Sequence, residues 1–169
     1  MGLLKIQAKK QVAMNIKIIA LGKIKEKFLK EGISEFLKRL TPYANMEIVE
    51  INPLEIKDAN LTAKVLEQEA EKILAQIKPN SYVITLEING ANFSSEKFAQ
   101  KLEEIGNQGY NEIVFVIGSS CGLAKIVSER ADLKLSLSSM TFLHQFARLL
   151  LLEQIYRAFK IQKGETYHK

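Results

Sequence analysis

The chain has 169 residues, 47% of them hydrophobic and 25% charged, with a formal net charge of +5 and a pI near 9.2. This composition is typical of a globular protein, and the basic balance fits an anionic partner such as nucleic acid without requiring one. The only cysteine, Cys121, excludes an internal disulfide and predicts a cytoplasmic location; no run approaches the ~18 apolar residues of a membrane span.

The first 13 residues stand apart from the rest. They lack the long apolar region of a signal peptide, and Met14 begins a cleaner strand pattern. Residues 1–13 are therefore expected to be a leader or an upstream start, and residues 14–169 a single domain.

Strand and helix patterns alternate through the first half of the domain. In chain order, the expected elements are a strand at 14–21, a helix at 25–40, a strand at 46–51, a helix at 61–77 and a strand at 81–88. Gly22 closes the first strand and Pro42 ends the first helix. Asn89-Gly90 is predicted to form a turn.

The second half continues the alternation. Ser94 is the expected N-cap of a helix that Gly106 and Gly109 end. The remaining elements are a strand at 112–117, a helix at 123–130, a strand at 133–137 and a helix at 143–161. This order predicts an α/β fold, with a parallel sheet covered by helices on both faces.

Three strand ends could bind a ligand, because open α/β sheets bind ligands beyond the carboxyl ends of their strands. They are residues 86–90, 118–122 and 137–142. None carries a GxGxxG motif, a Walker lysine or a GxSxG elbow, so a generic nucleotide site and serine catalysis are poorly supported. Turn geometry alone could explain Gly118 and Gly122, and Thr141 is predicted to be an N-cap.

The C-terminal block contains both histidines, His144 and His168. They lack neighbours at metal-ligand spacing, so no metal is expected. His144 could serve a site or simply bond a loop carbonyl.

The last helix is apolar on more than one face, which makes a symmetric dimer plausible. The C-terminal block, residues 140–169, contains five basic and two acidic residues, a net charge of +3. These charges could hold phosphates or form a solvated helix face.

Several motifs together resemble one family, the bacterial SPOUT-class methyltransferases known as ribosomal RNA large subunit methyltransferase H. The motifs, in order, are MNIKIIALGKIKEKF (14–28), KRLTPY (38–43), VITLEINGANFSSE (83–96), FVIGSSCGL (115–123), LSLSSMTFLHQFARLLLLEQIYRAFKI (135–161) and GETYHK (164–169). The resemblance covers essentially Met14 to Lys169. Two departures are Ser119, where the family has a second glycine, and Leu143, where it usually has proline.

The resemblance implies a C-terminal trefoil knot, a homodimer, and methyl transfer from S-adenosylmethionine to N3 of a pseudouridine in 23S rRNA of the assembled ribosome. It also implies a cofactor pocket formed by Leu86, Gly118, Leu137, Ser138, Ser139, Met140, Thr141 and Phe142. We hypothesise that His168 is, or orients, the base, that Tyr167 places the target, and that Arg148 or Arg157 holds phosphate or a ring oxygen. Two alternatives stay open: a nucleotide-binding domain with other chemistry, and a non-catalytic ribosome-binding module.

Overall fold

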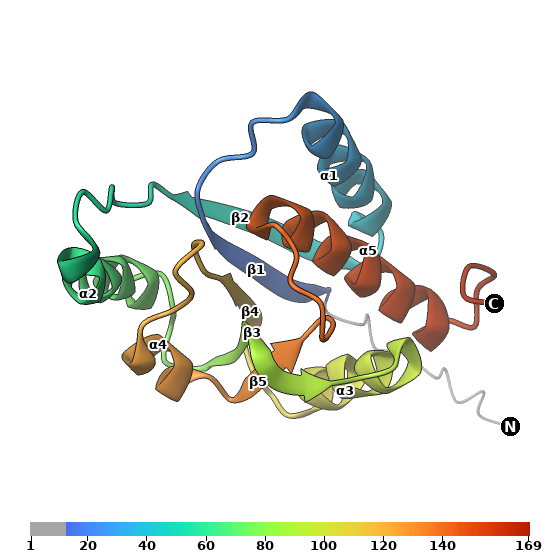
Figure 1. The fold of residues 1–169 in the computed structure, drawn as a ribbon. Coiled ribbons are helices and arrows are strands. Elements are labelled where there is room, and N and C mark those ends of the chain that lie inside the picture. Colours follow the sequence, from blue (N-terminus) through green and yellow to red (C-terminus); the bar gives the residue numbers. More distant parts are fainter. Residues whose placement is uncertain (1–12) are drawn as a thin grey trace, which may run out of the picture.

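The computed structural model describes residues 13–169, so most of the predicted leader lies outside the described residues. Its elements in chain order are β1 (Met14–Leu21), α1 (Lys27–Leu40), β2 (Ala44–Ile51), a 3₁₀ turn (Ala59–Leu61), α2 (Thr62–Leu74), β3 (Ser81–Asn92), α3 (Ser95–Asn107), β4 (Glu112–Ile117), α4 (Lys125–Arg130), β5 (Leu133–Ser136) and α5 (His144–Gln162). The predicted alternation of strands and helices is confirmed (Figure 1). None of the helices between residues 13 and 169 combines the length and apolar character needed to cross a membrane.

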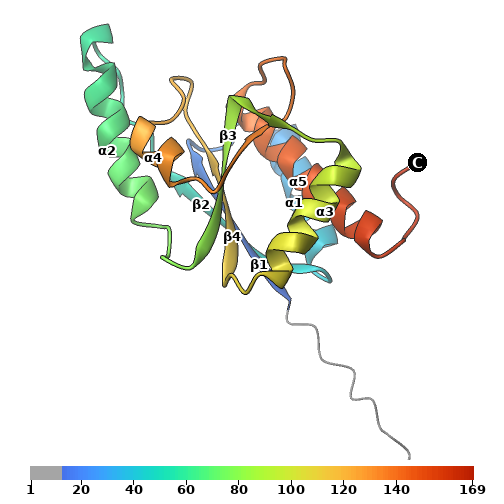
Figure 2. The same cartoon turned by 90° about the horizontal axis from the view of Figure 1, so that it is seen from below.

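The five strands form one parallel sheet in the order β2-β1-β4-β3-β5. Helices α1, α3 and α5 cover one face, and α2 and α4 cover the other, which gives the three layers seen in Figure 2. Every residue of β4 is buried, as expected for a central strand covered on both faces. The predicted fold class, a parallel α/β sheet with helices on both faces, is therefore confirmed.

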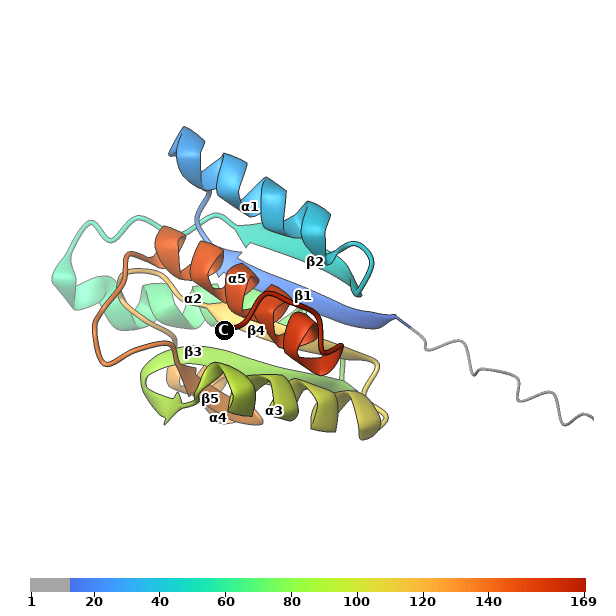
Figure 3. The same ribbon diagram turned by 90° about the vertical axis from the view of Figure 1, so that its right-hand side faces the viewer.

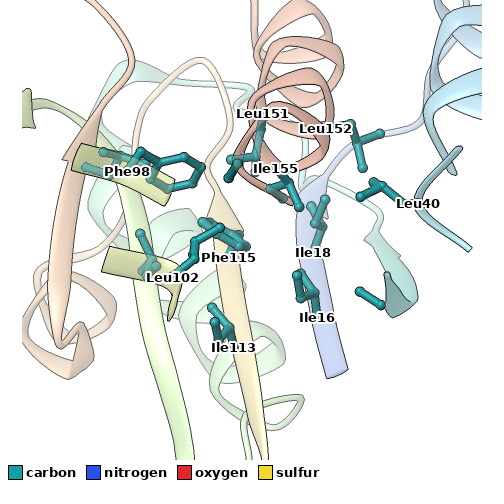
Figure 4. Close-up of a cluster of buried hydrophobic side chains, with 14 of the residues drawn as sticks. Ile16, Ile18, Leu40, Phe98, Leu102, Ile113, Phe115, Leu151, Leu152 and Ile155 are labelled. Carbon is teal, nitrogen blue, oxygen red and sulfur yellow. The ribbon is translucent and has the colours of Figure 1, made fainter. Parts of the chain in front are cut away.

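Helix α5 occupies the middle of its layer, between α1 and α3 (Figure 3). Its buried apolar residues meet those of β1, β4, α1 and α3 in one core, part of which is drawn in Figure 4. Leu151, Leu152 and Ile155 have no exposed surface. Burying three such side chains contributes about 5–8 kcal/mol of transfer free energy, so α5 is an integral part of the fold.

Some predicted boundaries are wrong, and side-chain or tertiary contacts explain them. Ser94 caps α3 as predicted, by accepting a hydrogen bond from Lys97 N, but Gly106 lies inside that helix. Thr141 is not an N-cap; Leu143 occupies that position, without a side-chain hydrogen bond, and its φ of −56° is one that proline also adopts. Leu143 therefore has a backbone φ that would also accept the proline expected there from the family resemblance.

The largest difference lies at the end of β3. The predicted turn at Asn89-Gly90 is instead part of a strand that continues to Asn92, with a register shift against β5. Leu135 of β5 is opposite both Leu86 and Ala91, so residues 87–90 bulge out of the ladder. A Cβ on Gly90 would lie 2.7 Å from the carbonyl carbons of Lys134 and Leu135, which means that β5 passes too close for any side chain.

Gly90→Ala is expected to lower the free energy of unfolding by about 1–3 kcal/mol, because rigid backbone cannot yield to the added methyl group. Urea denaturation followed by circular dichroism measures this loss. Gly106→Ala is the matched control, since its Cβ would meet only the flexible end of Met14 and alanine favours the helix. Equal stabilities for the two variants would contradict the close approach of β5 to Gly90.

Candidate active site

A cavity of about 610 Å³ opens at the carboxyl ends of β3, β4 and β5. Parallel strands bring these ends to one edge of the sheet, and the first turns of α5 close the cavity from the side. Its lining residues are Leu86, Glu87, Ile88, Asn89, Ile117, Gly118, Ser119, Ser120, Gly122, Leu123, Leu135, Ser136, Leu137, Ser138, Met140, Thr141, Phe142, Leu143, His144 and Ala147. The three strand ends selected from the sequence therefore meet in one place.

Seven of the eight residues predicted to bind the cofactor line this cavity, and Ser139 does not. The loop they form is held by its own serines: Ser136 Oγ donates to Ser138 O at 2.9 Å, and Met140 N donates to Ser138 Oγ at 3.0 Å. Met140 is 74% exposed and Phe142 40% exposed, so both side chains are free to cover a bound molecule. Among residues 13–169, no cluster of three His, Cys, Asp or Glu side chains could hold a metal.

Gly118 is required by the turn that follows β4. Its Cβ would lie 2.7 Å from Gly122 O, because residues 119–122 fold back and form a bridge from Ser119 to Gly122. Gly122 has a φ of +80°, which favours glycine. The geometry of the turn and the shape of the cavity thus both depend on Gly118 and Gly122. Cys121 lies in the same turn and is exposed.

His144 lines the cavity at the start of α5, next to Gly22. Burial, and secondarily the positive charge of Arg148, lower the pKa of this imidazole below its ordinary value. His144 is therefore neutral at pH 7, and it adds hydrogen-bonding capacity to the cavity without adding charge.

The C-terminal tail is docked on the other half of α5. Tyr167 Oη donates to Glu153 Oε1 at 3.0 Å, and its ring lies against Tyr156 and under Arg157. Burial, followed by the bond to Glu153, raises the pKa of Tyr167, so it stays a neutral phenol. Glu165 is bonded to Lys160 and to Tyr43 of the α1–β2 connection. The tail is thus an ordered part of the structure.

His168 is held between two helices. Arg157 Nη1 lies 3.2 Å from its Nδ1, and Glu96 Oε1 lies 2.8 Å from its Nε2. Because a guanidinium can only donate, Nδ1 accepts and Nε2–H donates to Glu96. The backbone N–H of Glu96, followed by His168 and Ser94, lowers the pKa of this carboxyl to about 2. Glu96 and Glu153 were not predicted as partners of the tail, because nothing in the sequence pattern links them to residues 72 and 14 positions away.

The tail and the cavity lie at opposite ends of α5 within one chain. His144 lines the cavity and Arg157 holds His168, and a helical rise of 1.5 Å per residue separates these positions by about 20 Å. In Figure 1 the tail lies beyond the end of α5, away from the loop that leads into the helix. The structure therefore groups Tyr167 with His168 but does not bring either to the cavity of the same chain.

Arg148, the third residue predicted to be catalytic, is 2% exposed. Its guanidinium donates to Glu50 Oε1 at 2.5 Å and to Gly22 O at 2.9 Å, so it ties α5 to the ends of β1 and β2. These contacts favour a structural role for Arg148. Its predicted contact with RNA would require it to leave a buried position, where Nε already lacks a partner.

Comparison with known proteins connects this geometry to a family. Residues 14–168 match the family model described as "Predicted SPOUT methyltransferase". The chain is 52% identical over 160 residues to ribosomal RNA large subunit methyltransferase H of Carboxydothermus hydrogenoformans. This match covers 92% of this chain and 100% of that relative.

A solved structure from Haemophilus influenzae Rd KW20, described as "a probable methylase family protein", is similar in fold. It superposes with a TM-score of 0.52 at 14% identity, and the match covers 92% of this chain and 71% of that one. At this identity the likeness concerns the fold alone.

Arg148→Ala is expected to lower the free energy of unfolding by about 2–4 kcal/mol, because Glu50 and Gly22 O lose a charged donor at a buried site. Denaturant titration measures the loss, and Arg39→Ala, which breaks an exposed pair with Glu35, should cost far less. An Arg148→Ala protein of unchanged stability that has lost RNA methylation would contradict the structural role and restore the catalytic one.

Proposed function

Since this chain belongs to the SPOUT methyltransferase family, we propose that it methylates large-subunit ribosomal RNA with S-adenosylmethionine as the methyl donor. The observation that carries the proposal is the match to a ribosomal RNA large subunit methyltransferase H along that relative's entire length. Conserving half of all positions across a whole domain leaves little room for a change of chemistry. The target we propose is N3 of a pseudouridine in 23S rRNA of the assembled ribosome.

The donor is assigned to the cavity at the ends of β3, β4 and β5. Its volume of about 610 Å³ suits a molecule of this size, and its lining combines apolar side chains with serines and glycines. We assign binding to seven of the predicted residues and leave out Ser139, which does not line the cavity; the seven are Leu86, Gly118, Leu137, Ser138, Met140, Thr141 and Phe142. When bound, S-adenosylmethionine supplies an electrophilic methyl group, which needs no metal.

The tail is assigned to the RNA base. N3–H of a pseudouridine is a weak acid, so its methylation is helped by a group that accepts the proton. His168 Nδ1 is the acceptor nitrogen of the docked imidazole, and Glu96 orients the ring through Nε2. Arg157, once it no longer donates to Nδ1, can bind a phosphate or a ring oxygen, and we assign it this role in preference to Arg148. Tyr167 helps to place the base.

A homodimer resolves the separation of tail and cavity. Large apolar side chains lie exposed around the start of α5. Their solvent-accessible fractions range from 40% to 74%, for Phe28, Met140, Phe142, Leu143 and Phe146. Such a patch on a monomer is typical of an interaction surface. Pairing two copies with their α5 helices side by side and antiparallel would bring the tail of one subunit to the cavity of the other, so that two chains form each site.

The trefoil knot is also a proposal. It rests on the match of residues 14–168 to the SPOUT family model. A cytoplasmic location is proposed because the ribosome is the substrate, and the formal charge of +5 suits binding to RNA.

The competing function is a non-catalytic ribosome-binding module that binds RNA through the basic C-terminal block. Transfer of tritiated methyl from S-adenosylmethionine to ribosomes that lack the modification separates the two. The methyltransferase should add about one methyl per ribosome, whereas the module would add none. His168→Ala should reduce the rate by roughly 100-fold or more, as expected for loss of a general base, with unchanged donor affinity by calorimetry.

Lys169→Ala is the matched control for this variant, since it changes the adjacent tail residue without touching the imidazole. Full methylation by His168→Ala would remove His168 from the role of base. Donor binding without any methyl transfer by the wild-type protein would favour the binding module.

A further inference from the structure

Glu87 carries the only formal charge among the residues that line the donor cavity. The other lining side chains are apolar, hydroxyl or amide groups, apart from His144, whose lowered pKa keeps it neutral. Glu87 directly follows Leu86, in the segment that bulges between β3 and β5. The cavity is therefore anionic in a protein whose net charge is positive.

The carboxylate of Glu87 is fixed in position. Thr85 Oγ1 donates to Oε1 at 2.7 Å, and Ser128 Oγ of α4 donates to Oε2 at 3.0 Å. Thr85 is fully buried, so this support is part of the protein interior. Each carboxylate oxygen can accept more than one hydrogen bond, which leaves capacity for a ligand.

No cation neutralises this carboxylate within the described part of the chain. None of the ion pairs among residues 13–169 includes Glu87. Two hydroxyl groups stabilise a negative charge but do not cancel it. The field of Glu87 therefore acts on whatever occupies the cavity, with little competition and, in a partly enclosed site, with limited screening.

The methyl donor and its product differ by one positive charge. S-Adenosylmethionine carries a sulfonium, an ammonium and a carboxylate, a net charge of +1 at pH 7. When the methyl–sulfur bond breaks, its electron pair stays on sulfur and the sulfonium becomes a neutral thioether. The N3 proton of the base leaves to the general base as the methyl–nitrogen bond forms. S-Adenosylhomocysteine therefore has a net charge of zero but almost the same shape.

We propose that Glu87 is a specificity residue that makes the cavity favour the cationic donor over the neutral product. The inference rests on the proposed function, because it requires that this cavity takes S-adenosylmethionine. Shape can hardly separate two ligands that differ by one methyl group, whereas a fixed carboxylate separates them by charge. Once methyl transfer has removed the sulfonium charge, the product is held less tightly and exchanges for fresh donor.

Calorimetry on wild type and Glu87→Gln tests the proposal with three probes: S-adenosylmethionine, S-adenosylhomocysteine and sinefungin, whose protonated amine replaces the sulfonium. Glu87→Gln should weaken binding of the two cationic ligands roughly three- to tenfold, as expected for loss of one charge in a partly solvated site. Binding of the neutral product should change little. Raising the salt concentration should weaken the preference of the wild type for the cationic ligands over the neutral product. In Glu87→Gln this ratio of affinities should not depend on salt.

Glu129→Gln is the matched control, because it removes the same charge from the exposed face of α4, where Glu129 pairs with Lys125. It should leave all three affinities unchanged. Glu87→Asp keeps the charge and should retain the preference for cations. Thermal unfolding of each variant checks that the fold is kept.

Equal weakening of all three ligands by Glu87→Gln would overturn the proposal and make Glu87 an ordinary hydrogen-bonding or structural residue. Unchanged affinity for all three would overturn it as well. Failure of the wild type to bind any of the three would overturn the proposed function, and this inference with it, so the two failures are distinguishable.

Discussion

The burial of α5 against the sheet is the constraint on which the other features depend. This helix fills the space between α1 and α3, and its leucines and Ile155 complete the larger core. Arg148 fixes its register by binding Glu50 and Gly22 O at the ends of β2 and β1. Since one rigid helix carries a wall of the cavity at its start and the docked tail at its end, packing in the core sets the distance between the two functional groups.

The parallel sheet provides the other half of the site. Its strand order places the ends of β3, β4 and β5 next to one another, and the backbone there is shaped by glycines whose side-chain space is already taken. The bulge at residues 87–90 is central to this arrangement. It brings Glu87 to the cavity and lets β5 pass beside Gly90, so one irregularity in the ladder accounts for both the close approach of β5 and the only charged residue that lines the cavity.

The sequence predicted the fold class and the element order, because hydrophobic periodicity is a local signal. Seven of the eight residues predicted to bind the cofactor line the cavity, because strand ends are also local signals. It failed where partners distant in the chain decide the outcome. Asn89-Gly90 has the composition of a turn, yet pairing with β5 extends the strand. Arg148 was predicted to hold phosphate or a ring oxygen, but its guanidinium is buried and binds Glu50, 98 residues away. The docking of Tyr167 and His168 on Glu153 and Glu96 also depends on tertiary contacts, which no periodicity encodes.

The central claim, that α5 separates the tail from the cavity of its own chain and that two chains form each site, is tested by subunit mixing. Ala147→Trp should fill the cavity, and His168→Ala should remove the proposed base. A purified heterodimer of these two variants should recover roughly half of wild-type methylation, because one of its two sites combines an intact cavity with an intact tail, while each variant homodimer is inactive. An inactive heterodimer, or a monomeric mass of the wild type by light scattering, would contradict the account.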